Sequence, residues 1–400
     1  MEAPEAAGAK IYFASRTNNL SSGGIGAWIR LVRSRGAVDL AVGNPEYPET
    51  PVAMISAVCA AIKSGCNQYE DPFGAKAARV ALARTFGRNA DPETELTITC
   101  GATEGLTAAL LALVEPGDEV VTFEPLYQNH LDAIRLAGGQ ARLVRLRPPR
   151  WRYDPAELRR AFGARSRVFL LNTPHNPTGR VFEAAEIAEI AELCLRWNTV
   201  MVSDEVYADF VFGDRRHVSV ADVAELAPRA VVVGSLSKSH AVSGWRQGFL
   251  WARAATTQVL RQVHVALTGG AAAPLQQAFV QLDACGHAGG NGGVGMEERL
   301  GRAMAIFQGR GLECIAPEGG CYFMVDAGDA GQDSCSYADW LLENRRVAVA
   351  PGSLFYASPA DGLDYFRVAF NKSDETLWRA QARMSDSGRG SAPTDDRTCK

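Results

Sequence analysis

The sequence predicts an α/β protein that has one large domain with a mostly parallel β-sheet and one smaller α+β domain. Between residues 97 and 251, short apolar runs alternate with segments of helical periodicity, and this alternation is typical of βαβ units. The last hundred residues instead mix short strands and helices. Apolar residues make up 47% of the 400 residues and charged residues 22%, which is ordinary for a globular protein with a sizeable core.

The elements follow from periodicity, taken in chain order. Residues 39–51 predict a short strand that runs into a proline-rich turn, and residues 51–64 have helical spacing with five apolar side chains on one face. These five are Met54, Ile55, Val58, Ala61 and Ile62. Residues 97–110 predict a strand, a glycine turn and a helix, and residues 119–127 predict the next strand and turn.

The central part continues the alternation. Apolar runs predict strands at 141–146, 167–171, 199–203 and 230–234. Helical periodicity predicts helices at 128–137, 155–162, 183–196, 255–267 and 275–283. Residues 286–295 contain six glycines in ten positions and predict a flexible loop.

Composition and charge exclude several classes of protein. The formal net charge of −4 gives no support for binding to nucleic acid or to a membrane surface. No apolar run approaches the roughly 18 residues of a spanning helix, and the N-terminus lacks the pattern of a signal peptide. The nine cysteines are odd in number and form no C-x-x-C pair, so we expect a reduced, cytoplasmic protein without a metal site.

One segment concentrates the chemistry of the chain. An apolar run predicts a buried strand at 230–233, and Ser235, Ser237, Lys238 and Arg246 follow it before the next apolar run. Burial of an ammonium group is costly, so a lysine between two buried strands is expected to have the lowered pKa that amine nucleophiles need. The hydroxyl groups and the guanidinium offer donors and a fixed positive charge to phosphate oxygens. The segment therefore predicts a lysine Schiff base beside a phosphate, which is pyridoxal phosphate chemistry.

The string S-L-S-K-S at 235–239, followed by G-W-R-Q-G at 244–248, resembles the cofactor-lysine segment of the class I and II aminotransferases of PLP fold type I. The strings N-T-P-H-N-P-T-G at 172–179 and S-D-E-V-Y at 203–207 match the same family. The resemblance covers roughly residues 20–383. It implies pyridoxal 5'-phosphate as the cofactor and an aspartate-aminotransferase-like fold whose large domain holds a seven-stranded, mostly parallel sheet.

The resemblance also implies roles for individual residues. Lys238 carries the cofactor as an aldimine and moves the Cα proton, Asp204 pairs with the ring nitrogen, and Tyr207 bonds to O3′. The other cofactor contacts implied are Gly101, Ala102, Thr103, Tyr127, Asn176, Ser235, Ser237, Arg246 and, from the neighbouring subunit, Tyr69. The substrate contacts implied are Gly43, Asn176 and Arg367, of which Arg367 clamps the α-carboxylate through two parallel hydrogen bonds.

The domain boundaries follow from the resemblance together with composition. We expect an N-terminal arm at 1–20, a small domain from 21–50 and 286–384, and a large cofactor-binding domain at 51–285. Residues 385–400 are rich in Ser, Gly, Asp and Pro and predict a disordered tail.

We therefore expect an aminotransferase that acts on the α-amino group of an amino acid, with a 2-oxo acid as acceptor, as a homodimer with shared sites. An alternative on the same scaffold is β- or γ-elimination, γ-replacement or carbon–carbon bond formation on an amino acid with a leaving group, such as the sulfonium of S-adenosylmethionine. A non-catalytic regulator is disfavoured by the intact Lys238, Asp204 and Arg367. His240 stands where relatives more usually carry an aromatic or small residue, and the sequence assigns it no role.

Overall fold

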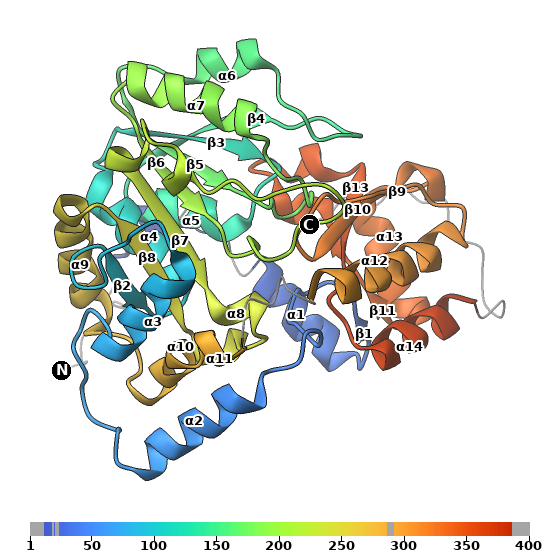
Figure 1. The fold of residues 1–400 in the computed structure, drawn as a ribbon. Helices are drawn as coiled ribbons and strands as arrows, with labels where there is room; N and C mark the ends of the chain where they lie inside the picture. Colours follow the sequence, from blue (N-terminus) through green and yellow to red (C-terminus); the bar gives the residue numbers. More distant parts are fainter. Residues whose placement is uncertain (1–11, 18–19, 21–23, 286–291, 386–400) are drawn as a thin grey trace, which may run out of the picture.

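The computed structural model describes residues 12–17, 20, 24–285 and 292–385, and a seven-stranded sheet forms its larger part (Figure 1). The strand order is β2-β8-β7-β6-β5-β3-β4. The strands are β2 (Leu96–Thr99), β3 (Glu119–Glu124), β4 (Gln140–Arg145), β5 (Ser166–Asn172), β6 (Val200–Asp204), β7 (Ala230–Ser235) and β8 (Gly248–Ala252). Strands β4, β3, β5, β6 and β7 pair in parallel, whereas β8 pairs antiparallel with both β7 and β2. The predicted α/β class with a mostly parallel seven-stranded sheet is confirmed.

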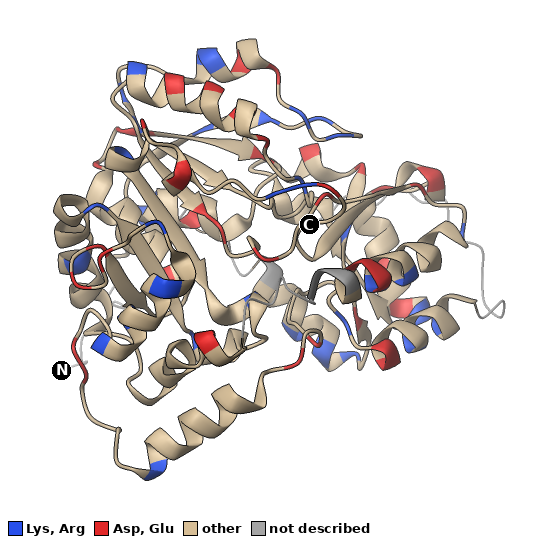
Figure 2. Ribbon diagram, in the orientation of Figure 1, with Lys and Arg blue, Asp and Glu red and all other residues tan. Residues whose placement is uncertain are grey.

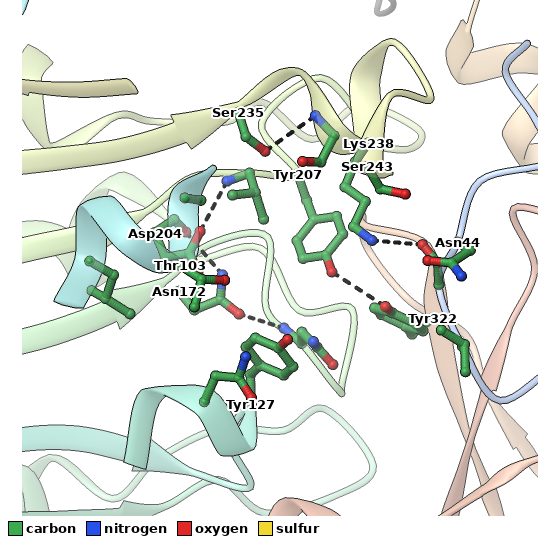
Figure 3. Close-up of a pocket in the computed structure, with 18 of the residues that line it drawn as sticks. Asn44, Thr103, Tyr127, Asn172, Asp204, Tyr207, Ser235, Lys238, Ser243 and Tyr322 are labelled. Atoms are coloured by element: carbon green, nitrogen blue, oxygen red, sulfur yellow. Dashed lines mark hydrogen bonds between the residues drawn. The ribbon is translucent and has the colours of Figure 1, made fainter. Parts of the chain in front are cut away.

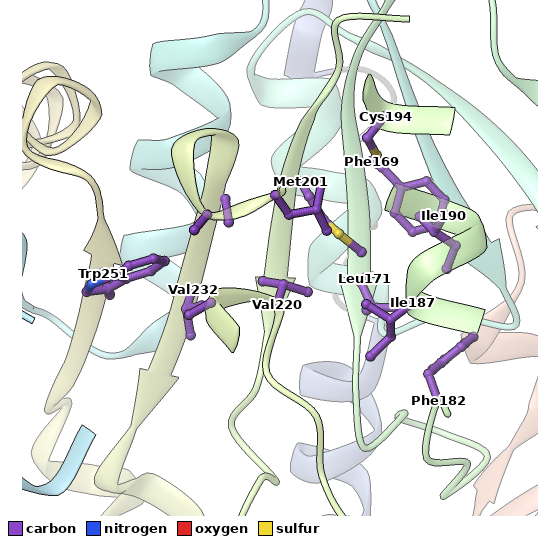
Figure 4. Packing of buried hydrophobic residues seen from close by; sticks show 14 of the residues in the cluster. Phe169, Leu171, Phe182, Ile187, Ile190, Cys194, Met201, Val220, Val232 and Trp251 are labelled. Atoms are coloured by element: carbon purple, nitrogen blue, oxygen red, sulfur yellow. The ribbon is translucent and has the colours of Figure 1, made fainter. Parts of the chain in front are cut away.

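Helices cover both faces of this sheet, and the central strands are therefore buried on both sides. On one face, Val168, Leu170 and Val202 pack with α4 (Ala102–Leu113), α5 (Gln128–Leu136) and α9 (Ala254–Thr268). On the other face, Phe169, Leu171 and Met201 pack with Ile187, Ile190 and Cys194 of α7 (Ala184–Arg196; Figure 4). The other helices of this part are α2 (Val52–Lys63), α3 (Lys76–Phe86), α6 (Pro155–Ala161), α8 (Leu236–Ser239), α10 (Gln277–Val280) and α11 (Leu282–Cys285).

Local sequence explains where these helices begin. Helix α7 starts with a capping box in which Glu183 and Glu186 satisfy each other's backbone N–H groups. Helix α6 starts at Pro155 after Asp154, whose side chain accepts a hydrogen bond from the N–H of Ala156. These helix starts lie close to the positions expected from periodicity.

The smaller part is built from both ends of the chain. Its four-stranded sheet has the order β12-β13-β10-β9, and a separate parallel pair joins β1 to β11. The strands are β1 (Val38–Asp39), β9 (Cys314–Ile315), β10 (Tyr322–Asp326), β11 (Val347–Ala348), β12 (Ala350–Pro351) and β13 (Tyr365–Ala369). The helices are α1 (Gly24–Ser34), α12 (Gly292–Gln308), α13 (Ser334–Trp340) and α14 (Asp374–Ser385). The pairing of β1 with β11 supports a small domain made from two distant segments, whose boundaries stay a prediction.

Helix α2 lies where periodicity predicts it, but the chain covers its apolar face only in part, and the glycine-rich stretch differs from the expected loop. Helix α2 buries Met54 and Val58, but Ile55 and Ile62 are 42% and 47% exposed, because the helix contacts the rest of the chain on one narrow side only. The glycine-rich stretch is not a loop throughout, since α12 begins at Gly292. Glycine suits this first turn because the helix passes close to Tyr47, where a Cβ on Gly295 would lie 2.0 Å from the tyrosine oxygen.

Some predicted segments lie outside the described residues. These are most of the arm at 1–20, residues 286–291 of the glycine-rich stretch, and residues 386–400 of the predicted tail. Within the described part, no helix combines the length and the apolar character needed to cross a bilayer. Basic and acidic residues alternate along the ribbon in both parts of the molecule (Figure 2).

Candidate active site

Three neighbouring parallel strands end in polar residues that meet at one edge of the large sheet. Strands β5, β6 and β7 end at Asn172, Asp204 and Ser235, and Asn172 is directly opposite Asp204 in the register. Ligands bind outside the carboxyl ends of strands in open α/β sheets. A cavity of about 530 Å³ opens here, between the large sheet and the segments of the smaller part (Figure 3).

Twelve of the predicted site residues line this cavity. They are Gly43, Ala102, Thr103, Tyr127, Asn176, Asp204, Tyr207, Ser235, Ser237, Lys238, Arg246 and Arg367. Gly101 lies at its wall, where it contacts Arg246. The structure therefore brings together residues that are spread over most of the chain.

Lys238 is placed by α8, which follows directly on β7. Its Nζ donates a hydrogen bond to the backbone carbonyl of Gly43, at 2.7 Å. Burial lowers the pKa of Lys238, the nearby thiol of Cys321 opposes this, and three cations add to the lowering. The cations are Arg367, Lys372 and Arg246. A lowered pKa increases the fraction of neutral amine, which is the nucleophilic form.

The Asp204 carboxylate is held on both oxygens. Its Oδ2 lies 2.8 Å from Nε2 of His130, and its Oδ1 accepts a hydrogen bond of 3.3 Å from the N–H of Val206. Asn172 fixes the backbone at this point, because its Nδ2 donates to the carbonyl of Asp204 at 2.9 Å. The Oδ1 of Asn172 in turn accepts from the N–H of Asn176 at 2.8 Å, so the strand end and the following loop are tied together.

Arg246, Gly101 and the start of α4 form a corner suited to an anion. Gly101 has φ of +80°, and a Cβ at this position would lie 2.5 Å from Nη2 of Arg246, so only glycine lets the guanidinium approach the backbone here. Helix α4 begins at Ala102 with backbone N–H groups that have no partner within the helix. The hydroxyl-bearing side chains of Thr103, Ser235 and Ser237 line the same cavity. This donor set fits a phosphate group.

Arg367 lies on the small-sheet side, in strand β13. Its Nη1 donates to Oδ1 of Asn176 at 2.7 Å and its Nη2 to the carbonyl of Ala41 at 2.6 Å. The guanidinium lies 3.8 Å from the ring centroid of Tyr322 and 4.5 Å from that of Phe355. Its Nε is buried and finds no hydrogen-bond partner among the described residues. A buried, oriented guanidinium with remaining donors suits a carboxylate ligand.

Two tyrosines meet in the centre of the cavity. The hydroxyl of Tyr207 lies 3.4 Å from that of Tyr322, and Figure 3 shows the two side chains pointing toward each other. Burial raises the pKa of both phenols, so they remain neutral and able to donate hydrogen bonds at neutral pH. Tyr127 lies at the start of α5 and packs edge-to-face on His130, with ring centroids 5.4 Å apart.

Tyr69 is the one predicted site residue that the structure places away from the cavity. Its side chain is 97% exposed, in the segment after α2.

The sequence reasoning also missed residues that the structure brings into the site. His130, Asn172 and Tyr322 line the cavity, and their signals were a histidine three residues after Tyr127, an asparagine at a strand end, and an aromatic residue in a small-domain strand. Among the described residues, no cluster of three or more His, Cys, Asp or Glu side chains could hold a metal ion.

The sequence of the whole chain was compared with known protein families, and the result is consistent with this arrangement of a lysine, a carboxylate and two guanidinium groups. The family described as aminotransferase class I and II matches residues 35–384. The chain belongs to this family. The methionine aminotransferase of Escherichia coli K12 is 32% identical to it over 361 residues, which span 88% of this chain and 93% of that enzyme.

Solved structures show the same relationship. The structure of N-succinyldiaminopimelate aminotransferase from Mycobacterium tuberculosis matches this aminotransferase with a TM-score of 0.88 and 32% identity, over 94% of this chain and 99% of that one. An aspartate aminotransferase double mutant from Thermus thermophilus matches with a TM-score of 0.81 and 26% identity, over 93% and 98%. The predicted aspartate-aminotransferase-like fold and the predicted transaminase activity on an amino acid are confirmed. Membership of this family favours transamination over the elimination, replacement and carbon–carbon alternatives.

Proposed function

We propose that this aminotransferase uses pyridoxal 5'-phosphate to move the α-amino group of an amino acid to a 2-oxo acid. One observation carries the proposal: Lys238 and Asp204 share a cavity with one guanidinium from the large-sheet side, Arg246, and another from the small-sheet side, Arg367. The amine matches the aldehyde of the cofactor, and the carboxylate matches its pyridine nitrogen. One guanidinium matches the cofactor phosphate, and the other matches the carboxylate of the substrate.

Each end of the cofactor has donors or acceptors of the right chemistry. Arg246, Ser235, Ser237, the hydroxyl of Thr103 and the N–H groups of Ala102 and Thr103 at the start of α4 would hold the phosphate, and Gly101 would let it approach the backbone. Asp204 would hold the proton on the ring nitrogen, Asn176 and Tyr207 would orient the ring oxygen, and Tyr127 would stack on the ring.

When bound, pyridoxal phosphate withdraws electrons from the Cα–H bond of an attached amino acid and makes that proton removable. In this proposal the Nζ of Lys238 attaches the cofactor between turnovers and, when free, accepts and returns the substrate proton. The lowered pKa of Lys238 supports this role, because only the neutral amine accepts a proton. Arg367 and the backbone at Gly43 would bind the α-carboxylate and so set which bond at Cα is broken.

We also propose a homodimer in which each site borrows Tyr69 from its neighbour. Helix α2 presents an exposed apolar face, on which Val52 is 76% exposed and Ile55 and Ile62 are nearly half exposed. Burial of such a face against a second copy is favourable at roughly 25 cal/mol per Å² of apolar area. Tyr69 follows this helix and is almost fully exposed, so it is available to a partner subunit.

The test is a half-reaction that separates transamination from elimination. The protein is loaded with pyridoxal phosphate and incubated with single amino acids, and the cofactor, the organic product and free ammonium are measured. Transamination converts the cofactor stoichiometrically to pyridoxamine phosphate and yields a 2-oxo acid of the same carbon skeleton. Release of ammonium or of a leaving group, with no pyridoxamine phosphate, would replace the proposal by the elimination alternative.

A further inference from the structure

A second buried lysine lies beside the site and has no role in the proposed chemistry. Lys372 follows strand β13 and is 1% exposed. Its Nζ donates to the carbonyl of Val42 at 2.8 Å and to that of Asn44 at 3.4 Å, and it lies 3.7 Å from Oε1 of Glu46. One short segment of the chain thus accepts two hydrogen bonds from this ammonium group and places a carboxylate at ion-pair distance from it.

The same segment is contacted at every carbonyl from residue 41 to residue 44. Arg367 donates to the carbonyl of Ala41 at 2.6 Å, and Lys238 donates to that of Gly43 at 2.7 Å. Asn371 adds a hydrogen bond of 3.3 Å to Gly43. Together with Lys372, these side chains fix four consecutive carbonyl groups. The carbonyl of Ala41 is held by Arg367, which is proposed to bind the substrate, and that of Gly43 by Lys238, which is proposed to bind the cofactor.

The far end of the segment is tied to the residues that follow Lys372. The Glu46 carboxylate accepts hydrogen bonds from the backbone and hydroxyl of Ser373, at 3.1 and 2.9 Å, and from Thr376 at 2.6 Å. Burial opposes ionisation of Glu46, but these hydrogen bonds and the charge of Lys372 outweigh it, so the pKa of the carboxyl is lowered. The Glu46 carboxyl is therefore ionised at neutral pH.

Gly43 packs against Tyr322 with no room for a side chain. A Cβ at this position would lie 2.0 Å from the hydroxyl oxygen of Tyr322, so the backbone touches the ring directly. The orientation of the Gly43 peptide, which faces the cavity, then depends on the groups that hold its neighbours. Lys372 holds the neighbour on each side.

We infer that Lys372 is a positioning residue of the active site, whose ammonium group holds the backbone of residues 42–44 so that Gly43 faces both Lys238 and the substrate carboxylate. The inference rests on the proposed function for the identity of the ligand. Lys372 also contributes a fixed charge to the surroundings of Lys238, together with Arg367, Arg246 and the Cys321 thiol.

The test compares Lys372→Met with Lys372→Arg, which keeps the charge, and with Lys76→Met, which removes an exposed lysine at the start of α3. We expect Lys372→Met to raise KM for an amino acid about tenfold or more with a smaller change in kcat, as for a lost ground-state interaction. Lys372→Arg should recover part of this loss, and Lys76→Met should behave as the parent. A folded Lys372→Met protein with the parent KM would overturn the inference.

A second readout separates positioning from a general loss of stability. In protein loaded with pyridoxal phosphate and without substrate, the pH midpoint of the visible absorbance change reports protonation of the Lys238 nitrogen in its bond to the cofactor. Loss of the Lys372 charge should move this midpoint to higher pH, and Glu46→Gln, which leaves that charge unbalanced, should move it to lower pH. Equal midpoints in the parent and both variants would contradict the inference, and Glu46→Gln decides the matter if Lys372→Met does not fold.

A third readout needs no cofactor. Backbone hydrogen exchange of residues 41–46 in the cofactor-free protein should be faster in Lys372→Met than in the parent and in Lys76→Met. Unchanged exchange in this segment would overturn the inference. A parent protein that fails to bind pyridoxal phosphate would overturn the proposed function alone.

Discussion

Nε2 of His130 lies 2.8 Å from Oδ2 of Asp204, and both side chains are buried. The histidine comes from α5 and the aspartate from the end of β6, so the contact joins a helix to a strand of the central sheet. With the N–H of Val206 on the other oxygen, the carboxylate has a fixed orientation toward the cavity. A carboxylate that must bind a ring nitrogen gains from such a second contact because its rotamer is already restricted.

We therefore predict that His130→Ala weakens the binding of pyridoxal phosphate roughly ten- to hundredfold, because a hydrogen bond to a charged group contributes about 1.5–3 kcal/mol. The dissociation constant is measured by titration of the cofactor-free protein. Arg135→Gln, on the same helix and partly exposed, serves as the control and should bind normally. Parent affinity in His130→Ala would mean that the Asp204 orientation does not depend on this contact.

Asp204 itself should matter more than the residue that orients it. Asp204→Ala is expected to weaken cofactor binding and to lower kcat by about a hundredfold or more, because the carboxylate would keep the ring nitrogen protonated and the positive charge of that nitrogen stabilises the electron-rich transition state. The variant is assayed at saturating pyridoxal phosphate so that loss of binding and loss of chemistry are separated. Near-normal turnover under these conditions would remove Asp204 from the proposed mechanism.

Site residues that stand in a recognisable string of the sequence could be predicted. Site residues whose role depends only on a contact with a distant segment could not. Lys238, Asp204 and Asn176 stand in contiguous strings that follow buried strands, and the boundaries of these strands were placed within one or two residues. His130 is 74 positions from Asp204 and Lys372 is 330 positions from Val42, and each reads locally as an ordinary helix or loop residue.

The periodicity of α2 shows a second limit of sequence reasoning. Ile55 and Ile62 have the spacing of core residues, yet the chain does not cover them. Apolar periodicity indicates that a helix face is to be buried, but it does not say whether the chain itself or a second molecule buries it.

Lys238 is predicted to be the residue that carries the cofactor. Treatment of the loaded protein with borohydride should fix the cofactor covalently to Lys238, and mass spectrometry of the digested protein identifies the modified peptide. Lys238→Ala should lose the covalent label and all turnover, because no other amine replaces the nucleophile. Labelling of Lys238→Ala after dialysis would show that another lysine serves.

Sharing of the site between subunits can be tested by complementation. Tyr69→Phe removes a phosphate donor and should be impaired at limiting cofactor, and Lys238→Ala should be inactive. If Tyr69 acts in the neighbouring site, a mixed dimer of the two contains one complete site and recovers about half of the parent activity. A mixed dimer of Lys238→Ala with Arg367→Ala contains no complete site and is the control. An absence of recovery in confirmed mixed dimers would count against sharing.

The last prediction concerns how the amino acid is held. Arg367 is clamped between the rings of Tyr322 and Phe355 and is oriented by Asn176 and Ala41, so its guanidinium has one geometry. Lysine cannot reproduce two parallel hydrogen bonds to a carboxylate. Arg367→Lys should therefore bind amino acids more weakly by roughly 2–5 kcal/mol while it still attaches the cofactor.

Amines without a carboxylate provide the decisive comparison for this variant, because their binding does not use the clamp. We expect Arg367→Lys to raise KM for amino acids and to leave the reaction with a simple amine unchanged, whereas Arg379→Lys, which is exposed on α14, should alter neither. If Arg367→Lys instead processes amino acids at the parent rate and affinity, the carboxylate must be bound elsewhere. Arg367 would then serve only to connect Asn176 with the segment at Ala41.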